Sequence, residues 1–433
     1  MRATDGSFAR LPMAAIVCVV MSACGDDGSG QATDTTAATG STTTGSSGSS
    51  GSTSSTSGPE TTAADTTDGT ASGSDGSSGT TTGDPSEQEL LFPSSLHAMR
   101  TGKETFYTGL PGAPGFEQLT NVPYDALACS GCHGPTLADG TPVDVETYEP
   151  SCADCHADPQ MPTPEVPDPT CLGCHGRQAA EINLDMAGVP HMSDVHRAAG
   201  MTCVECHYGD EMHGDGNEYL SMLEPGAPRA ECIDCHAAPP SNMAHNLHIT
   251  DVDCASCHTQ SVIACNNCHF ETELEADMKR FYGPPPFNGF SLLVNREQTG
   301  RVHPATYQSL TYGGQSFMVI APYYPHTVGP VARTCDDCHA SAALQQLEDT
   351  GVIDFVRWDE ATQTLTGPSG VVPVPLDWYQ SMIVDFLDYT AADLSAPTDP
   401  DAWQYQQTGI DLDQMLFASP LTAAQIDALR DGG

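Results

Sequence analysis

Positive charge is scarce in this sequence. Its 433 residues contain 14 lysines and arginines, and Lys103 and Lys279 are the two lysines, against 57 aspartates and glutamates. The formal net charge is −43 at pH 7. Proteins that bind nucleic acid carry basic clusters that neutralise phosphates. The sequence therefore excludes nucleic acid as a natural partner. The acidic surface favours redox partners with basic docking surfaces, or serves solubility.

Long apolar runs are also rare. Arg2 and Arg10 give the chain a basic start, and the apolar run 11–20 is too short to span a bilayer as a mature helix. It ends in Met21-Ser22-Ala23-Cys24, which resembles the processing box of bacterial lipoproteins. We expect residues 1–24 to be a lipoprotein-type signal peptide with lipidation at Cys24. Ordinary signal cleavage nearby is the alternative, and both routes export the chain to the periplasmic side of a membrane or to the cell surface.

Residues 25–88 lack large apolar residues almost completely. They consist mainly of Ser, Thr, Gly, Ala and Asp, without hydrophobic periodicity. Such a segment cannot bury enough apolar surface to offset the entropy of ordering, so it is expected to be disordered. A Gly/Ser-rich segment behaves as a flexible tether. With a lipid at Cys24, it would let the rest of the chain reach away from its membrane, or act as a simple spacer.

Cysteine, by contrast, is abundant and arranged in one repeated pattern. Sixteen of the 18 cysteines belong to eight copies of Cys-x-x-Cys-His. The copies are Cys129/Cys132/His133, Cys152/Cys155/His156, Cys171/Cys174/His175, Cys203/Cys206/His207, Cys232/Cys235/His236, Cys254/Cys257/His258, Cys265/Cys268/His269 and Cys335/Cys338/His339.

This spacing is the attachment signature of c-type haem. Cysteines three positions apart on a helical turn point the same way, so each can reach one vinyl group of a porphyrin. The histidine that follows is placed to bind the iron as proximal ligand. Zinc sites and disulfide frameworks are the alternatives, but neither requires a histidine after every second cysteine. We therefore expect eight covalently attached c-type haems.

The sequence also contains eight histidines outside these motifs. None of them lies before residue 97 or after residue 339, and they are His97, His191, His196, His213, His245, His248, His303 and His326. A neutral imidazole is a good sixth ligand to haem iron. Equal numbers of proximal and free histidines permit every haem to be bis-histidine and closed to substrate. Methionine ligation is the alternative, with Met161, Met186, Met192, Met201, Met212, Met222 and Met243 in the same region.

The spacing of the motifs predicts the fold class. Residues 89–345 form the expected octahaem domain, with roughly 30 residues for each porphyrin and little conventional core. We expect a mostly irregular fold with short α-helices around stacked covalent haems. Residues 270–334 form an insert, in which 308–312 and 315–320 around Gly313-Gly314 predict a β-hairpin. Residues 346–433 are a haem-free extension expected to pack on the haem domain, with a closing helix from Ser419-Pro420 to Leu429.

Several segments carry a resemblance to a known family. They are Asp194–His207 and His245–His258 around two motifs, Leu292-Leu-Val-Asn295 in the insert, and Ala332–His339 at the last motif. Over about 89–345 the chain resembles octahaem cytochromes of the tetrathionate reductase-like group, which is related to hydroxylamine oxidoreductases and pentahaem nitrite reductases. The resemblance implies a multihaem fold and, in catalytic members, one haem with an open or unusual ligand position, often lysine.

Two functions follow from these observations. The first is electron transfer in respiration along mainly bis-histidine haems, and the lack of any Cys-x-x-Cys-Lys motif favours it. The second is reduction of small sulfur or nitrogen oxyanions at one open haem, for which Arg177, Arg197 and Arg229 are candidates to bind the anion. Whether the chain is an enzyme, and which residues would be catalytic, stay open. A lipid-anchored subunit of a larger electron-transfer complex is a further interpretation.

Overall fold

The structure is a computed structural model that describes residues 86–111, 113–127, 136–144, 147–158, 166–276, 287–391, 400–407 and 413–432. The chain divides into two units, and all described residues belong to the one that contains Ser86–Gly433. The expected signal peptide with Cys24, the tether up to residue 85, and the first motif with Cys129, Cys132 and His133 lie outside the described residues. No helix in the described ranges is long and apolar enough to cross a membrane.

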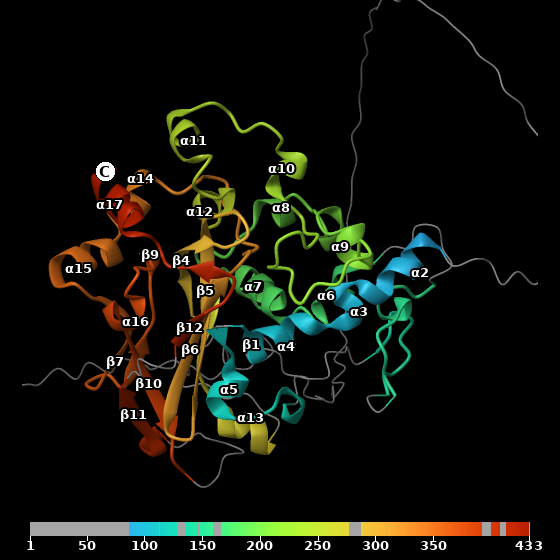
Figure 1. Cartoon of the computed structure of the whole chain (residues 1–433), viewed down its shortest axis with the longest axis horizontal. Coiled ribbons are helices and arrows are strands. Elements are labelled where there is room, and N and C mark those ends of the chain that lie inside the picture. The colour runs from blue at the N-terminus through green and yellow to red at the C-terminus, as the bar shows by residue number, and fades with distance from the viewer. Residues whose placement is uncertain are drawn as a thin grey trace, which may run out of the picture. The chain divides into compact units, whose positions relative to one another are not determined.

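Residues 86–258 form short helices joined by irregular segments (Figure 1). The longest, α7, has eleven residues. The α-helices are α2 Glu87–Leu91, α3 Leu96–Met99, α4 Thr101–Thr108, α5 Phe116–Thr120, α6 Asp168–Leu172, α7 Gly176–Met186, α8 Val195–Ala198, α9 Asp210–His213, α10 Cys232–Cys235, α11 Met243–His248 and α12 Cys254–His258. The 3₁₀-helices η3 Phe92–Ser94, η4 Tyr124–Ala126, η6 Cys152–Asp154 and η7 Cys203–Glu205, and the strands β1 Gly109–Leu110 and β2 Ala113–Pro114, complete this part.

Capping explains why several motifs begin a helical turn. The residue before the first cysteine and the acidic residue before the second form a capping box in four motifs. At Cys203, for example, the backbone N–H of Thr202 donates to Glu205 Oε2 at 2.6 Å. Such reciprocal bonds satisfy the N–H groups that a helix start leaves unpaired. The turn therefore holds the two cysteines and the histidine in one local arrangement before any tertiary contact is considered.

Residues 262–419 build two sheets. The larger has seven strands in the order β12-β6-β5-β3-β4-β13, with β9 paired to β4, and the smaller has four in the order β11-β10-β7-β8. The larger sheet contains β3 Val262–His269, β4 Phe287–Arg296, β5 Val302–Tyr312, β6 Gln315–Pro322, β9 Gly370–Pro373, β12 Asp413–Met415 and β13 Ala418–Ser419. The smaller sheet contains β7 Ile353–Asp359, β8 Thr364–Thr366, β10 Met382–Tyr389 and β11 Trp403–Gln407.

The predicted hairpin is confirmed. Strands β5 and β6 are antiparallel, and Tyr312 pairs with Gln315 across Gly313 and Gly314. Both glycines have positive φ, 59° and 74°, which a two-residue turn of this kind requires. The insert is not separate from the C-terminal extension, because β4 pairs with β9 and β13, and β6 pairs with β12. Segments on both sides of the last motif therefore share one sheet.

A conventional hydrophobic core lies in this sheet region, where the sequence led us to expect little. The largest cluster includes Phe290, Tyr307, Phe355 and Phe386, each at most 1% exposed. Aromatic rings of Phe290, Tyr307 and Phe355 contact one another, with centroids 4.8 to 6.3 Å apart. The low aromatic content of the whole chain concealed this core, because residues 25–88 contain no aromatic residue and residues 129–269 contain three, while most of the others follow residue 269.

Besides the 3₁₀-helix η8 Pro400–Ala402, five α-helices accompany the sheets in the described residues. They are α13 Phe270–Ala276, α14 Cys335–His339, α15 Ala342–Thr350, α16 Trp378–Ser381 and α17 Ala423–Asp431. The closing helix begins three residues later than the sequence suggested. Thr422 is its cap and forms a capping box with Gln425, whereas Pro420 precedes the helix and its carbonyl accepts from Asn295 Nδ2 at 2.8 Å. The side-chain cap, not the proline, therefore sets the start.

Candidate haem-ligating histidine pairs

Six histidines of the Cys-x-x-Cys-His motifs each face one free histidine. In all six pairs the ring centroids are 6.0 to 6.2 Å apart. The pairs are His156–His213, His175–His97, His207–His326, His236–His196, His258–His245 and His339–His248. Each pair joins one motif histidine and one free histidine, never two of the same kind.

This spacing fits a metal ion between the rings. Two imidazoles that bind one ion from opposite sides, with metal–nitrogen distances of about 2.0 Å, have centroids about 6 Å apart. Rings in direct contact would lie closer, as His303 and Tyr324 do at 4.5 Å. The residues present thus match the ligand set of a six-coordinate haem iron at six motifs. A c-type haem bound there would supply one-electron redox chemistry.

The free histidines come from different parts of the chain. His97 belongs to α3, His196 to α8 and His213 to α9, while His245 and His248 lie three residues apart on α11. Although His245 and His248 share one short helix, they face two different motif histidines, His258 and His339. His326, which follows the β5–β6 hairpin, faces His207 from the remote sheet region.

Burial keeps several of these rings neutral, the form that binds iron. Burial lowers the pKa of His97, His156 and His258 below the usual 6.5. It lowers the pKa of His175 to about 4. A neutral imidazole keeps the lone pair that a metal requires.

Carboxylates contact the second ring nitrogen of both members of one pair. His207 Nδ1 lies 2.8 Å from Glu211 Oε1. His326 Nδ1 lies 3.3 Å from Oε2 of Glu181, a side chain that is fully buried. Burial alone would lower the pKa of His326, but the hydrogen bond and charge of Glu181 raise it overall. Such outer carboxylates orient a ligating imidazole and strengthen its donation to the metal.

Among the described motifs, all except that of Cys265 form a row in which each motif is close to the next. The thiols of Cys171 and Cys203 are neighbours, and so are those of Cys232 and Cys254. Between three other pairs of successive motifs, the cysteines lie near enough for ionisation of one to affect the other. These cysteines are Cys155 and Cys171, Cys206 and Cys235, and Cys257 and Cys335. Six motifs thus follow one another in space in their order along the chain.

The second cysteine of four motifs is exposed. These cysteines are Cys155, Cys174, Cys206 and Cys235. Cys174 follows the end of α6, and its thiol is near enough to Tyr148 for their charges to interact. The protein alone therefore does not enclose Cys174. Because its thiol is accessible from outside, attachment of a porphyrin at Cys171 and Cys174 stays a prediction that the local geometry permits.

The motif at Cys265, Cys268 and His269 differs from the others. It lies in β3, which pairs with both β4 and β5, and every residue of this strand is buried. Cys265 is disulfide-bonded and Cys268 is 6% exposed. Haem attachment at Cys265 and Cys268 stays a prediction, which this buried location and the disulfide do not favour, because a porphyrin needs two free thiols and an open surface beside them.

The residues between these cysteines tie the two sheets together instead. Asn267 Nδ2 donates to Leu387 O at 2.8 Å, and Leu387 N donates to Asn267 Oδ1 at 2.9 Å. Asn266 Oδ1 accepts from Ser309 Oγ at 2.9 Å. Asn267 adopts a positive φ of 56°, which asparagine tolerates better than most residues. Asn266 and Asn267 of this motif therefore form hydrogen bonds within the core.

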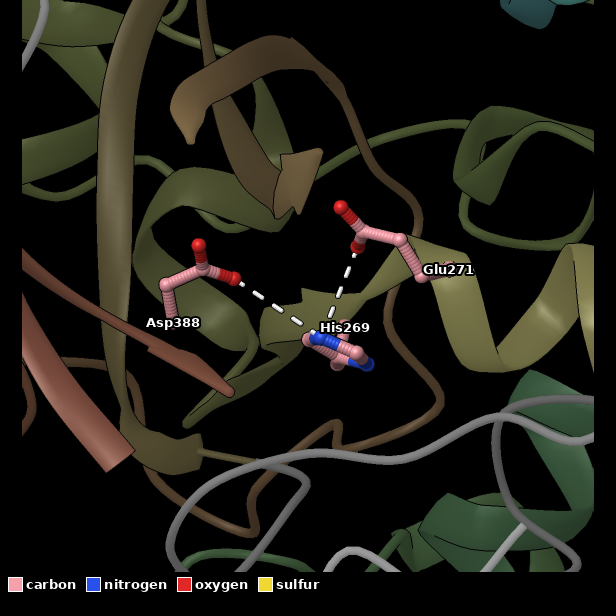
Figure 2. Close-up of side chains that lie close together, drawn as sticks. All are labelled: His269, Glu271 and Asp388. Atoms are coloured by element: carbon pink, nitrogen blue, oxygen red, sulfur yellow. Dashed lines mark ion pairs between the residues drawn. The ribbon is translucent and has the colours of Figure 1, made fainter. Parts of the chain in front are cut away.

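His269 faces acidic side chains rather than a free histidine (Figure 2). Its Nε2 lies 3.5 Å from Glu271 Oε2, 3.7 Å from Asp388 Oδ1 and 3.2 Å from Tyr389 O. Its Nδ1 lies 2.6 Å from Thr272 Oγ1. His269, Glu271 and Asp388 could together hold a metal ion, since their ligand atoms lie within 4.8 Å of one another. Hydrogen bonds within the protein also satisfy both ring nitrogens.

Two free histidines have no facing motif histidine in the described part of the chain. His303 is buried in β5, where Val294 pairs with it across the ladder, and its ring contacts Tyr324. His191 is exposed, with a positive φ of 67°. The sequence alone could not distinguish His191 and His303 from the other six free histidines, because the tertiary fold decides which of them faces a motif histidine.

Comparison with known proteins gives one informative likeness. Over 102 residues the chain is 29% identical to the cytochrome c-type protein NrfB of Escherichia coli O6:H1. The match covers 22% of this chain and 53% of NrfB, so the chain spans about half the length of this curated relative. No protein-family model matches, and no solved structure matches. The likeness supports a c-type cytochrome with covalently bound haem and a role in electron transfer.

Proposed function

We propose that this chain is an exported multihaem cytochrome c that conducts electrons along a row of bis-histidine haems. One observation carries the proposal: six motif histidines each face a free histidine at the spacing of two ligands on one iron. Because both axial positions are then filled, these irons exchange electrons but offer no position to a substrate.

The continuity of the motif row supports conduction. In the holoprotein these neighbouring cysteine sulfurs would be the thioether sulfurs that link the haems. Adjacent attachment points therefore imply adjacent haems. Electrons would enter and leave the row at its ends, at the motifs of Cys152 and Cys335 among the described ones. The protein's contribution is spacing, ligation and solvent exposure, while the cofactor carries the redox chemistry.

The proposed number of haems is seven, one for each motif except that of Cys265 and Cys268. The first motif, with Cys129, Cys132 and His133, is counted on its sequence. His191 is proposed as the distal ligand for His133, because the other free histidines either face a motif histidine or, like His303, lie in the sheet. Without His269 and His303, seven motif histidines and seven free histidines remain. Every proposed haem can therefore still have two histidine ligands.

Reduction of small sulfur or nitrogen oxyanions is the second candidate function. It would need one iron with an exchangeable position, which arises if His191 does not bind the iron beside His133. A group of arginines described in the next subsection could bind such an anion, but it lies near the motifs of Cys232 and Cys254, whose histidines both face a free histidine. Lys103 is exposed and stands on α4, a helix that carries no motif, so lysine ligation gains no support from it.

Location and partners follow from the sequence features. Haem attachment and the apolar N-terminal run support export to the periplasmic side of a membrane, and Cys24 is the proposed lipid anchor. The charge of −43 supports redox partners with basic docking surfaces, and a place in a larger electron-transfer complex.

Film voltammetry of the purified holoprotein tests this function. Reversible one-electron signals, unchanged by nitrite, sulfite or tetrathionate, are expected for a conductor. A catalytic wave that grows with the concentration of one of these anions would show instead that an iron is open and that the chain is a reductase.

A further inference from the structure

Arg296 is a buried cation without a counter-ion. It ends strand β4, and its side chain is 1% exposed. Nε and Nη2 of its guanidinium are buried and have no hydrogen-bond partner, and no ion pair in the described part of the chain includes it. A guanidinium stays charged in a protein, so burying it unpaired costs several kcal/mol. A structure that keeps such a group buried normally supplies an anion.

Tyr324 lies beside Arg296 and is also contacted by Arg229 and His303. The Arg296 Cζ lies 5.2 Å from the ring centre of Tyr324, and the Arg229 Cζ lies 5.7 Å from it. The ring of His303 meets Tyr324 edge-on at 4.5 Å. Each of these residues also has a buried polar atom without a partner: Arg229 Nε, Tyr324 OH and His303 Nε2. Unpaired buried groups are rare, and here four neighbouring side chains carry them.

The nearby carboxylates do not neutralise this group. Arg229 donates from Nη2 to Glu231 and from Nη1 to Gln298, so Glu231 contacts only one nitrogen of this guanidinium. Asp253 lies 3.9 Å from Arg301 Nη1 and 4.0 Å from His303 Nε2, and no ion pair joins it to Arg296. One guanidinium charge therefore remains unbalanced.

We propose that Arg229, Arg296 and Tyr324 form a buried binding site for a single carboxylate or a similarly small oxyanion. Two guanidinium groups and one hydroxyl offer the donors that such an anion accepts, and Arg geometry suits its paired oxygens. His303 forms the wall of the site. Its Nδ1 donates to Pro304 O at 2.7 Å, which fixes the ring, and its Nε2 is buried without a hydrogen-bond partner.

The anion has two possible sources. Tyr324 lies near enough to Cys232 for their charges to interact, and the thiols of Cys232 and Cys254 are neighbours. A haem at either motif carries propionate carboxylates, so the first source is internal and rests on the proposed function. The second source is a free oxyanion from solution. Both present the same chemistry to the arginines.

The sign of a stability change tests the site itself. Arg296→Gln removes the charge while keeping a polar side chain of lesser length. If an anion is bound, the substitution leaves it buried without a partner, and Tm of the holoprotein falls by several degrees. If no anion is bound, the substitution relieves an unpaired buried charge, so Tm stays equal or rises. The second result would overturn the proposal. Arg301→Gln is the control, because Arg301 already has Asp253 and backbone carbonyls as partners.

Two further measurements identify the source. In a buffer free of small anions, added nitrite or acetate raises Tm of the wild type but not of Arg296→Gln if the ligand comes from solution. If the ligand is a propionate, added anions have no effect. Arg296→Gln then lowers the midpoint potential of one haem more than Arg301→Gln does, because a bound positive charge stabilises the reduced state. Absence of both effects contradicts the proposal.

If Arg296→Gln does not accumulate as folded protein, Tyr324→Phe tests the anion site in its place. With an anion present, losing the hydroxyl removes a hydrogen bond and lowers Tm, whereas an unpartnered hydroxyl is lost at no cost. Haem content and spin state of each variant are measured first. A wild type without covalent haem would refute the proposed function, and the response to free anions would still test the arginine site.

Discussion

His207 and His326 face each other with ring centroids 6.0 Å apart, although one belongs to an attachment motif and the other follows the β5–β6 hairpin. This pair connects the two architectures of the chain. The helical region supplies the motif, and the sheet region supplies the opposing ring. Folding of the sheets is therefore expected to complete the ligation of this haem.

Replacing His326 by Gly should open one iron. With the distal imidazole gone, the haem at Cys203 and Cys206 becomes five-coordinate and high-spin, so about one haem in seven changes its spectrum. Visible absorption and electron paramagnetic resonance of the oxidised protein measure this. His303→Gln is the matched control and leaves all haems low-spin. A high-spin signal from His303→Gln, or none from His326→Gly, would contradict the assignment.

The same haem should have the lowest midpoint potential. Glu211 contacts His207 and Glu181 contacts His326, so both axial imidazoles carry a carboxylate partner. Negative charge behind both ligands stabilises the ferric iron. Glu181→Gln and Glu211→Gln should each raise the lowest potential by tens of millivolts, and their effects should add.

Redox titration of each variant checks this order. Asp185→Asn is the control, because Asp185 pairs with Arg197 and contacts no ring. If Asp185→Asn shifts the lowest potential as much as the glutamate variants do, the effect is general electrostatics and not ligand polarisation.

The haem count should be insensitive to one motif. A Cys265→Ala, Cys268→Ala double variant is expected to keep all seven haems, although it loses the disulfide and some stability. Intact-mass measurement compares it with a Cys171→Ala, Cys174→Ala double variant, which should lose one haem. Loss of a haem from the first variant would show that the buried strand is an attachment site after all.

Electron entry should depend on salt. The net charge of −43 attracts cationic partners over a distance set by screening, with a Debye length of about 10 Å at 0.1 M ionic strength. Reduction by a small cationic reductant should slow about tenfold between low and high salt. An anionic reductant in the same stopped-flow experiment should speed up. Equal, weak responses would place the electron entry point away from the acidic surface.

Much of the haem region could be predicted from the sequence, because its information is local. The Cys-x-x-Cys-His spacing and the capping residues beside it, such as Thr202 and Glu205, act within one turn. The hairpin at Gly313-Gly314 is equally local. These features need no knowledge of the tertiary fold.

The remainder depends on long-range contacts. Whether Cys265 and Cys268 meet a porphyrin or a neighbouring strand is decided by β4 and β5, which pair on either side of β3. The partner of His326 likewise follows from how the hairpin packs. Equal numbers of motifs and free histidines suggested eight closed haems, whereas the placement of His269 and His303 in the sheets supports seven.

Electron paramagnetic resonance of the fully oxidised holoprotein tests the central claim most directly. If every haem lies between two histidines, the spectrum contains only low-spin ferric signals, and adding nitrite or sulfite leaves it unchanged. A high-spin component that integrates to one haem and shifts with either anion would contradict the closed row and support an open catalytic iron.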